Sequence, residues 1–164
     1  MTWTQAPLLP TALLAAIAGA ARGQDTLFSI EGAGAGDRLG LSVAAFPDLD
    51  GDGWREIAVG EPLHDGPNGS NSGRARLLSG RSGAVIWNWD GEGPMDQFGQ
   101  VIQDVFDLDG DGVHDVAITA AHYPAGAFNG RVYLYSGATG LLLHAWTGEN
   151  AGDFFNFSRG VAGG

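Results

Sequence analysis

The chain has 164 residues, a formal net charge of −11 and no cysteine. Its length suits one ordinary domain, and 28 glycines in a composition that is 44% hydrophobic indicate a turn-rich folded protein rather than a disordered one. The negative charge argues against nucleic acids and anionic membranes as partners, and without cysteine no disulfide contributes to the fold.

Residues 1–23 have the features of a signal peptide. The apolar run Leu8–Ala21 is too short to span a membrane and has the length of a signal-peptide hydrophobic region. Cleavage is expected at Ala18-Gly19-Ala20 or after Gly23. Residues 2–7 carry no Lys or Arg, so a buried helix of the mature domain is the alternative. We predict export to a secreted or extracytoplasmic location, at the cell surface or in the periplasm, with no membrane span.

The rest of the chain repeats itself with a period of just under 60 residues. Residues 24–36 contain a short strand candidate, Leu27–Ile30, that aligns with the last strand of the later copies. We therefore expect them to form the outer strand of a neighbouring or closing unit. Full repeats are predicted at residues 37–95 and 96–152, and residues 153–164 begin a third repeat that is truncated.

Each full repeat predicts four strands bounded by glycine-rich turns. The expected strands are Leu41–Ala45, Ile57–Val59, Gly73–Leu78 and Ala84–Trp89, and then Gln100–Phe106, Val116–Ile118, Gly130–Tyr135 and Leu141–Trp146. No segment after the leader shows the 3.6-residue apolar period of a helix. Four short strands in roughly 58 residues is typical of a β-propeller blade, so the predicted fold is all-β, built of four-stranded antiparallel blades.

An acidic loop follows the first strand of each repeat. Carboxylates occupy loop positions 1, 3, 5 and 9, and glycines occupy positions 4 and 6, in both copies. Ca²⁺ takes six to eight oxygen ligands, and glycines allow the left-handed backbone of such a turn. The alternative is a polar turn without a cation, in which four clustered acids would repel one another. We predict two Ca²⁺ sites: Asp48, Asp50, Asp52 and Glu56 with the carbonyl of Trp54, and Asp107, Asp109, Asp111 and Asp115 with the carbonyl of Val113.

These elements together resemble the FG-GAP repeat of integrin α-chain propellers and related bacterial secreted proteins. The resemblance lies in Phe98-Gly99, with Leu39-Gly40 in the first copy, in the acidic loops, and in Ile57–Pro62 and Gly130–Tyr133. It covers residues 25–164, apart from local departures such as Phe155-Asn156 where Phe-Gly is typical. It implies a β-propeller whose hairpin loops hold Ca²⁺ on one face of the blades, and it does not extend to integrin ligand binding.

Other residue types give weaker signals. The four histidines are scattered, and no catalytic or cofactor-binding constellation appears, so we predict that the chain is not an enzyme. Arg74 and Arg131, one repeat apart, are expected to pair with acids. The tryptophans after the leader are expected to pack between sheets, and stacking on sugar rings is their alternative role.

The sequence therefore predicts a secreted calcium-binding β-propeller module for adhesion or protein–protein binding, whose ligand is an unknown protein or glycan. The alternatives are a lectin-like propeller and a non-catalytic part of a larger secreted enzyme. Propellers close with about four to eight blades. Because two blades cannot close a ring, we expect missing blades of a longer protein, or self-assembly, to complete it.

Overall fold

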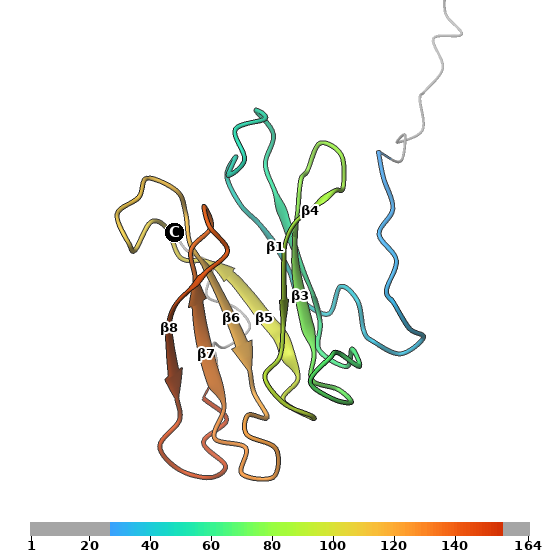
Figure 1. Cartoon of the computed structure of the whole chain (residues 1–164), viewed down its shortest axis with the longest axis vertical. Coiled ribbons are helices and arrows are strands. Elements are labelled where there is room, and N and C mark those ends of the chain that lie inside the picture. The colour runs from blue at the N-terminus through green and yellow to red at the C-terminus, as the bar shows by residue number, and fades with distance from the viewer. Residues whose placement is uncertain (1–26, 156–164) are drawn as a thin grey trace, which may run out of the picture.

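The computed structural model describes residues 27–155, which form two four-stranded antiparallel β-sheets (Figure 1). The first sheet contains β1 (Val43–Ala45), β2 (Ile57–Glu61), β3 (Arg74–Leu78) and β4 (Val85–Asp90). The second contains β5 (Phe98–Asp104), β6 (Val116–Ala120), β7 (Arg131–Tyr135) and β8 (Leu142–Thr147). Each sheet is ordered as the chain runs, so that every strand pairs with the next. Within residues 27–155 there is no helix, and hence none long and apolar enough to cross a membrane.

The two sheets share one register. Ile57 pairs with Leu78 in the first sheet, and one repeat later Val116 pairs with Tyr135. Both sheets also have an irregularity just before the last residue of the third strand, at Leu78 and at Tyr135. The predicted all-β fold with four-stranded antiparallel blades is confirmed.

The sheets pack face to face over a single hydrophobic core, with β5 lying against the first sheet (Figure 1). Alternation along β3 buries Ala75 and Leu77 against the second sheet, which contributes Ile118 to the same core. The backbones of the two sheets approach closely at Gly60 and Gly99, where a Cβ on Gly60 would overlap the carbonyl oxygen of Gly99. Only glycine at position 60 permits this spacing of the sheets.

Two of the predicted strands differ in the structure, one in its bounds and one in not being formed among the described residues. β5 begins at Phe98 and ends at Asp104, two residues earlier than expected, because Phe106 has a φ of 60° that no strand accommodates. Leu27–Ile30 are not in a strand. A β-strand requires a hydrogen-bonded neighbour, and no strand among the described residues pairs with this segment. Its expected role as the outer strand of a neighbouring or closing unit stays a prediction.

The predicted repeats enclose the observed sheets. Strands β1–β4 fall within residues 37–95 and β5–β8 fall within residues 96–152, while the boundaries themselves stay predictions. The predicted signal peptide, residues 1–23, lies outside the described residues, as do residues 156–164 of the predicted third repeat.

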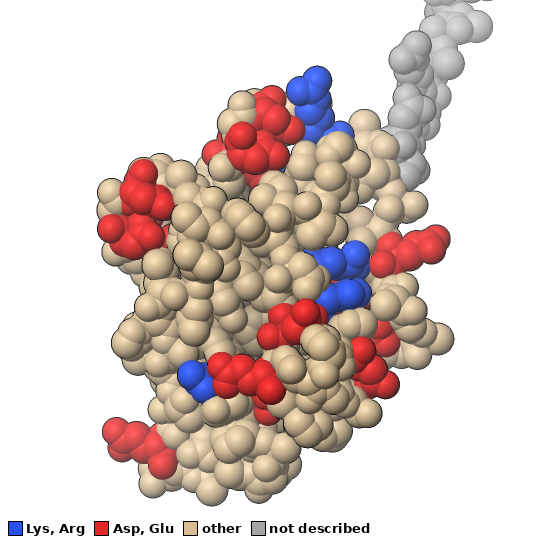
Figure 2. Space-filling model, viewed as in Figure 1, with Lys and Arg blue, Asp and Glu red and all other residues tan. Residues whose placement is uncertain are grey.

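Both acidic loops lie at the same end of the molecule, the upper end in Figure 1, because each follows the first strand of its sheet. In the space-filling view they appear as two separate groups of acidic side chains at that end (Figure 2). The connection from β4 to β5 lies at the opposite end.

Candidate metal centres

The first acidic loop joins β1 to β2 and folds around the side chain of Asp48. That carboxylate accepts hydrogen bonds from the backbone N–H groups of Gly51 (2.7 Å), Asp52 (3.1 Å) and Gly53 (2.8 Å). The φ angles of Gly51 and Gly53, 80° and 87°, lie in the left-handed region that glycine adopts without strain. The turn gathers one oxygen from each predicted carboxylate to within 4.8 Å of the others: Asp48, Asp50, Asp52 and Glu56.

The second acidic loop joins β5 to β6 and repeats this construction. Asp107 accepts hydrogen bonds from the N–H groups of Gly110 (2.6 Å) and Gly112 (2.9 Å), as Asp48 does at the equivalent positions. Oxygens of Asp107, Asp109 and Asp115 lie within 4.8 Å of one another. Asp111 is not part of this group, although it holds the loop by accepting a hydrogen bond from Val113 N–H at 2.8 Å.

The carboxylates at loop position 9, Glu56 and Asp115, are fully buried. Burial raises the pKa of each, and the nearby charges of Asp50 and Asp48 raise that of Glu56 further. Each carboxylate accepts a hydrogen bond from the backbone N–H at loop position 2, Leu49 at 2.7 Å and Leu108 at 2.9 Å. These bonds tie the start of each loop to its end.

Glu56 is left with an unsatisfied oxygen. Its Oε1 is buried and has no hydrogen-bond partner in the described part of the chain, whereas the second oxygen of Asp115 accepts from Gly137 N–H at 3.4 Å. Leaving a buried carboxylate oxygen without a partner is costly. The donors gathered in the loops are all oxygens, so the residues present fit a hard divalent cation.

The backbone at loop position 7 is fixed in both copies. Trp54 and Val113 each donate their N–H to the aspartate at position 5, Asp52 and Asp111, at 2.8 Å. The carbonyl groups that we predict as ligands belong to these two residues. Their role as ligands stays a prediction.

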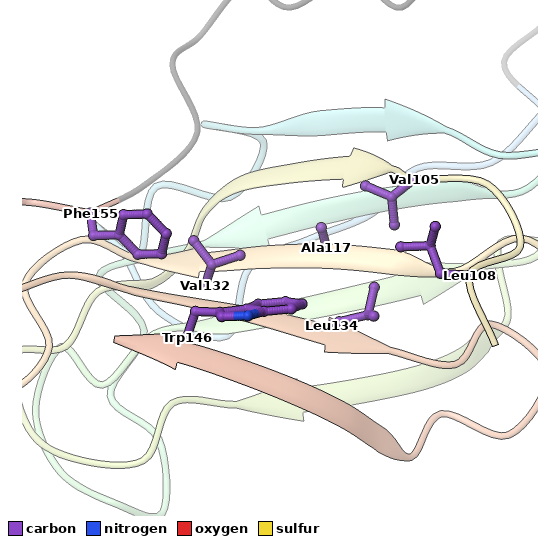
Figure 3. A pocket seen from close by; sticks show the side chains of 7 residues that line it. All are labelled: Val105, Leu108, Ala117, Val132, Leu134, Trp146 and Phe155. Carbon is purple, nitrogen blue, oxygen red and sulfur yellow. The ribbon is translucent and has the colours of Figure 1, made fainter. Parts of the chain in front are cut away.

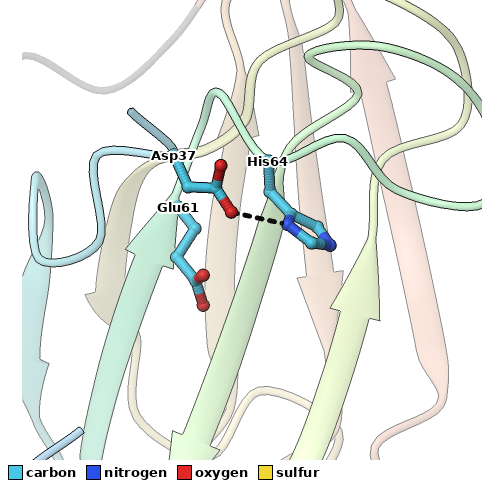
Figure 4. A group of neighbouring side chains, drawn as sticks. All are labelled: Asp37, Glu61 and His64. Atoms are coloured by element: carbon cyan, nitrogen blue, oxygen red, sulfur yellow. Dashed lines mark hydrogen bonds and ion pairs between the residues drawn. The ribbon is translucent and has the colours of Figure 1, made fainter. Parts of the chain in front are cut away.

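A third group of ionisable side chains, which the sequence did not indicate, lies where β2 ends (Figure 4). His64 Nδ1 and Asp37 Oδ2 are 2.9 Å apart, and Glu61 lies below them. Glu61 is fully buried, and its two oxygens pair with Arg74 and Arg76 at 2.7 Å each. Because both oxygens of Glu61 are already neutralised by arginines, this group does not form a metal centre comparable to the loops.

The predicted arginine pairs are confirmed. Arg74 pairs with Glu61, its neighbour across the β2–β3 ladder, and Arg131 pairs with Glu92 at 2.9 Å. The register of the hairpin places Arg74 directly opposite Glu61. Pairing the two predicted strands in the sequence could therefore have identified Glu61 as the partner of Arg74.

Two tryptophans of β4 join the sheets. The indole N–H groups of Trp87 and Trp89 donate to the carbonyl oxygens of Gly137 and Gly140, each at 2.8 Å. Trp89 is 7% exposed, so its ring faces are covered by protein. The predicted packing role is confirmed for this pair. Trp89 has no exposed ring face on which a sugar could stack.

Two four-stranded antiparallel sheets with one register, each with an acidic loop between its first two strands, define a repeat protein with blades of the β-propeller type. Comparison with known proteins gives the family. The FG-GAP repeat matches residues 39–78, which run from before β1 to the end of β3, and residues 104–135, which run from the end of β5 to the end of β7. This chain is an FG-GAP repeat protein with integrin α-like repeats.

Curated relatives agree with this assignment. Integrin alpha-6 of Gallus gallus is 31% identical over 140 residues, which are 78% of this chain and 12% of that protein. Integrin alpha-10 of Homo sapiens is 34% identical over 90 residues, 51% of this chain and 7% of the relative. Integrin alpha-PS2 of Drosophila melanogaster is 30% identical over 122 residues, which are 68% of this chain and 9% of that protein. The chain spans only about a tenth of the length of these relatives.

Proposed function

We propose that this chain is an exported, calcium-stabilised β-propeller module for adhesion or protein–protein binding. The integrin α-like repeats support the adhesion or protein-binding role. The observation that carries the calcium proposal is the buried Oε1 of Glu56, which lies beside three further carboxylates and has no hydrogen-bond donor within residues 27–155.

In this proposal each Ca²⁺ neutralises a cluster of acids and holds the first two strands of a blade at a fixed angle. Two bound ions would change the formal charge from −11 to −7, since each adds two positive charges. The affinity expected for an extracellular module is about 10⁻⁴–10⁻³ M. The ion would therefore bind outside the cell, where calcium is abundant, rather than in a cytoplasm.

The test is thermal unfolding of the chain, followed by circular dichroism in millimolar CaCl₂ and in EDTA. We expect calcium to raise the melting temperature of the parent, and the double variant Asp50→Asn/Asp109→Asn to lose this increase. Glu149→Gln removes an exposed acid outside the loops and should keep it. An equal calcium response in the parent and the double variant would disprove the loop sites.

A further inference from the structure

Each acidic loop is in contact with the turn between the third and fourth strands of its sheet. A Cβ on Gly80, in the first of these turns, would overlap the carbonyl oxygen of Arg55 at loop position 8. One repeat later, a Cβ on Gly137 would overlap the carbonyl oxygen of His114 in the same way. The contact is therefore part of the repeat, and the residues at equivalent places around the two loops can be compared.

The first loop and its turn present one aromatic and two basic side chains to solvent. Trp54, at loop position 7, is 52% exposed, and Arg55 in the loop and Arg81 in the turn are exposed as well. Ser79 Oγ, two residues before Arg81, donates to Asp52 Oδ2 at 3.3 Å and so ties the turn to the loop. Neither arginine forms an ion pair within residues 27–155. In the space-filling view, basic atoms lie beside one of the two acidic groups at this end and none lie beside the other (Figure 2).

The second loop lacks all three of these side chains. Val113, His114 and Ala138 occupy the equivalent places, and the ring of His114 is held by Asp104 at 2.9 Å. With one Ca²⁺ bound, the four carboxylates of the first loop and its two arginines have a formal charge of zero. The four carboxylates of the second loop keep a formal charge of −2 with the same ion. Although the chain as a whole is acidic, the surroundings of the first loop can therefore accept an anion that the second loop repels.

A second exposed tryptophan lies in very different surroundings. Trp146, which is 45% exposed, lines an open groove of about 380 Å³ on the second sheet, between Leu134 and Phe155 (Figure 3). Apart from the indole N–H of Trp146, the side chains that line this groove carry no polar group. The groove thus has no charged group to orient a polar ligand, whereas the first loop combines a ring face with cations.

We propose that the first loop binds an acidic glycan, a sugar chain that carries carboxylates, through its Ca²⁺ and the side chains of Trp54, Arg55 and Arg81. The proposal rests on the calcium site proposed above for this loop. The loop supplies five ligand groups and Ca²⁺ takes six to eight oxygens, so the ion has room for an oxygen of the sugar. Guanidinium groups bind carboxylates through paired, charge-assisted hydrogen bonds.

The exposed indole favours a sugar over an acidic peptide. The carbonyl of Trp54 is a proposed ligand, so its side chain starts beside the ion, and its N–H bond to Asp52 holds the backbone there. An indole offers a flat apolar face on which a sugar ring can lie. In a uronic acid the carboxylate is attached to the ring itself, so one sugar unit can stack on Trp54 while its carboxylate meets the cations. An acidic peptide side chain brings the charge without such a face.

The test is isothermal titration of the parent with three uronic acid hexasaccharides, which contain glucuronate, mannuronate or galacturonate. Each is measured with CaCl₂ matched in cell and syringe, and again in EDTA. We expect at least one of the three to bind in calcium and none to bind in EDTA. The same oligosaccharide with its carboxylates reduced to alcohols should bind roughly tenfold more weakly, because it keeps the ring faces and loses the charge.

Two variants introduce the residues of the second loop. Trp54→Val and Arg81→Ala should each lower the affinity for the sugar by about five- to tenfold. Arg38→Ala is the matched control, since Arg38 is an exposed arginine outside both loops and their turns, and it should keep the affinity. Arg81→Ala should also keep the rise in melting temperature that calcium gives the parent, because Arg81 is not a ligand of the ion.

The melting temperature separates the two ways in which the experiment can fail. If calcium raises the melting temperature of the parent but none of the three oligosaccharides binds, the inference is overturned and the calcium sites stand. Without any calcium response, the proposed function and this inference fall together. Equal binding of the carboxyl-reduced sugar, or equal losses in Arg38→Ala and Arg81→Ala, would also overturn the inference. So would calcium-dependent sedimentation with phosphatidylserine vesicles in the absence of sugar binding, because the surface would then bind a membrane.

Discussion

Glu56 and Asp115 hold the same position in the two acidic loops, but of the two only Glu56 keeps a buried carboxylate oxygen that accepts no hydrogen bond from the described part of the chain. The second oxygen of Asp115 accepts from the N–H of Gly137, and no equivalent bond reaches Glu56 Oε1. A cation would therefore relieve a larger desolvation cost in the first loop than in the second. We expect the first loop to gain more stability from Ca²⁺.

Glu56→Gln tests this difference. In calcium we expect the variant to lose about 1–3 kcal/mol of unfolding free energy, because a neutral amide binds the ion poorly. In EDTA it should be as stable as the parent or more so, since the amide removes repulsion with Asp48 and Asp50. Urea unfolding in both buffers measures the two effects. An equal loss in calcium and in EDTA would show that Glu56 has only a structural role.

Asp96, a buried acid outside the loops, predicts a pH dependence. It is 2% exposed and accepts a hydrogen bond from Gly93 N–H at 2.7 Å. Burial raises its pKa, and Glu92 adds to this, whereas the Gly93 bond and Arg131 oppose it. A carboxyl whose folded pKa lies above its unfolded value is harder to ionise in the folded state. Its contribution to stability is therefore present at low pH and is lost as the pH rises through the folded value.

Asp96→Asn should remove the loss of stability that accompanies the ionisation of Asp96 as the pH rises. The stability of the variant relative to the parent is expected to be greater at pH 7 than at pH 4. Urea unfolding in EDTA at both pH values gives the comparison without calcium effects. If variant and parent differ in unfolding free energy by the same amount at both pH values, the ionisation of Asp96 does not destabilise the folded state.

Most of the fold could be predicted from the sequence, because glycine-rich turns separate the strands of each repeat. The residues that form each acidic loop are also close together in the chain. The hydrogen bonds of Asp48 to Gly51 and Gly53 involve residues at most five positions apart. Spacing alone could therefore predict which carboxylates the first loop gathers. In the second loop the structure gathers Asp107, Asp109 and Asp115 and leaves Asp111 outside the cluster, and its role as a ligand stays a prediction.

Features that depend on tertiary contacts could not be predicted from the sequence. Val105-Phe106 reads as a continuing strand, but Phe106 takes a left-handed conformation, and β5 ends before it. Asp37 and His64 meet across separate segments of the chain, which no local pattern encodes. Leu27–Ile30 have the apolar pattern of a strand, but pattern does not supply the neighbour to which a strand must bond.

The contact between Trp87 and Gly140 predicts a sensitive position at the junction of the sheets. Gly140 has a φ of 69°, and a Cβ there would lie 2.6 Å from two ring carbons of Trp87. We expect Gly140→Ala to cost about 2–4 kcal/mol, from backbone strain and displacement of the indole. Gly126→Ala is the matched control, because Gly126 has a φ of 86° and nothing within 4 Å of its added Cβ. It should cost about 1–2 kcal/mol from strain alone. Equal losses in urea unfolding would mean that the Trp87 contact contributes nothing.

Phe28 takes the place on the first sheet that Trp87 takes on the second. A Cβ on Gly83 would lie 2.8 Å from the ring of Phe28, as a Cβ on Gly140, one repeat later, would meet Trp87. The leading segment thus follows the path of a fourth strand without forming one.

If this packing stabilises the fold, Phe28→Ala should cost about 1–2 kcal/mol, less than for a fully buried phenylalanine because the ring is half-buried. Leu27→Ala removes a neighbouring side chain that is 76% exposed, and should change the stability by less than about 0.5 kcal/mol. Thermal unfolding of both variants in calcium distinguishes them. Equal, small effects would show that residues 27–30 do not hold this position in solution, whereas the expected difference would place the segment in phase with the repeats that follow it.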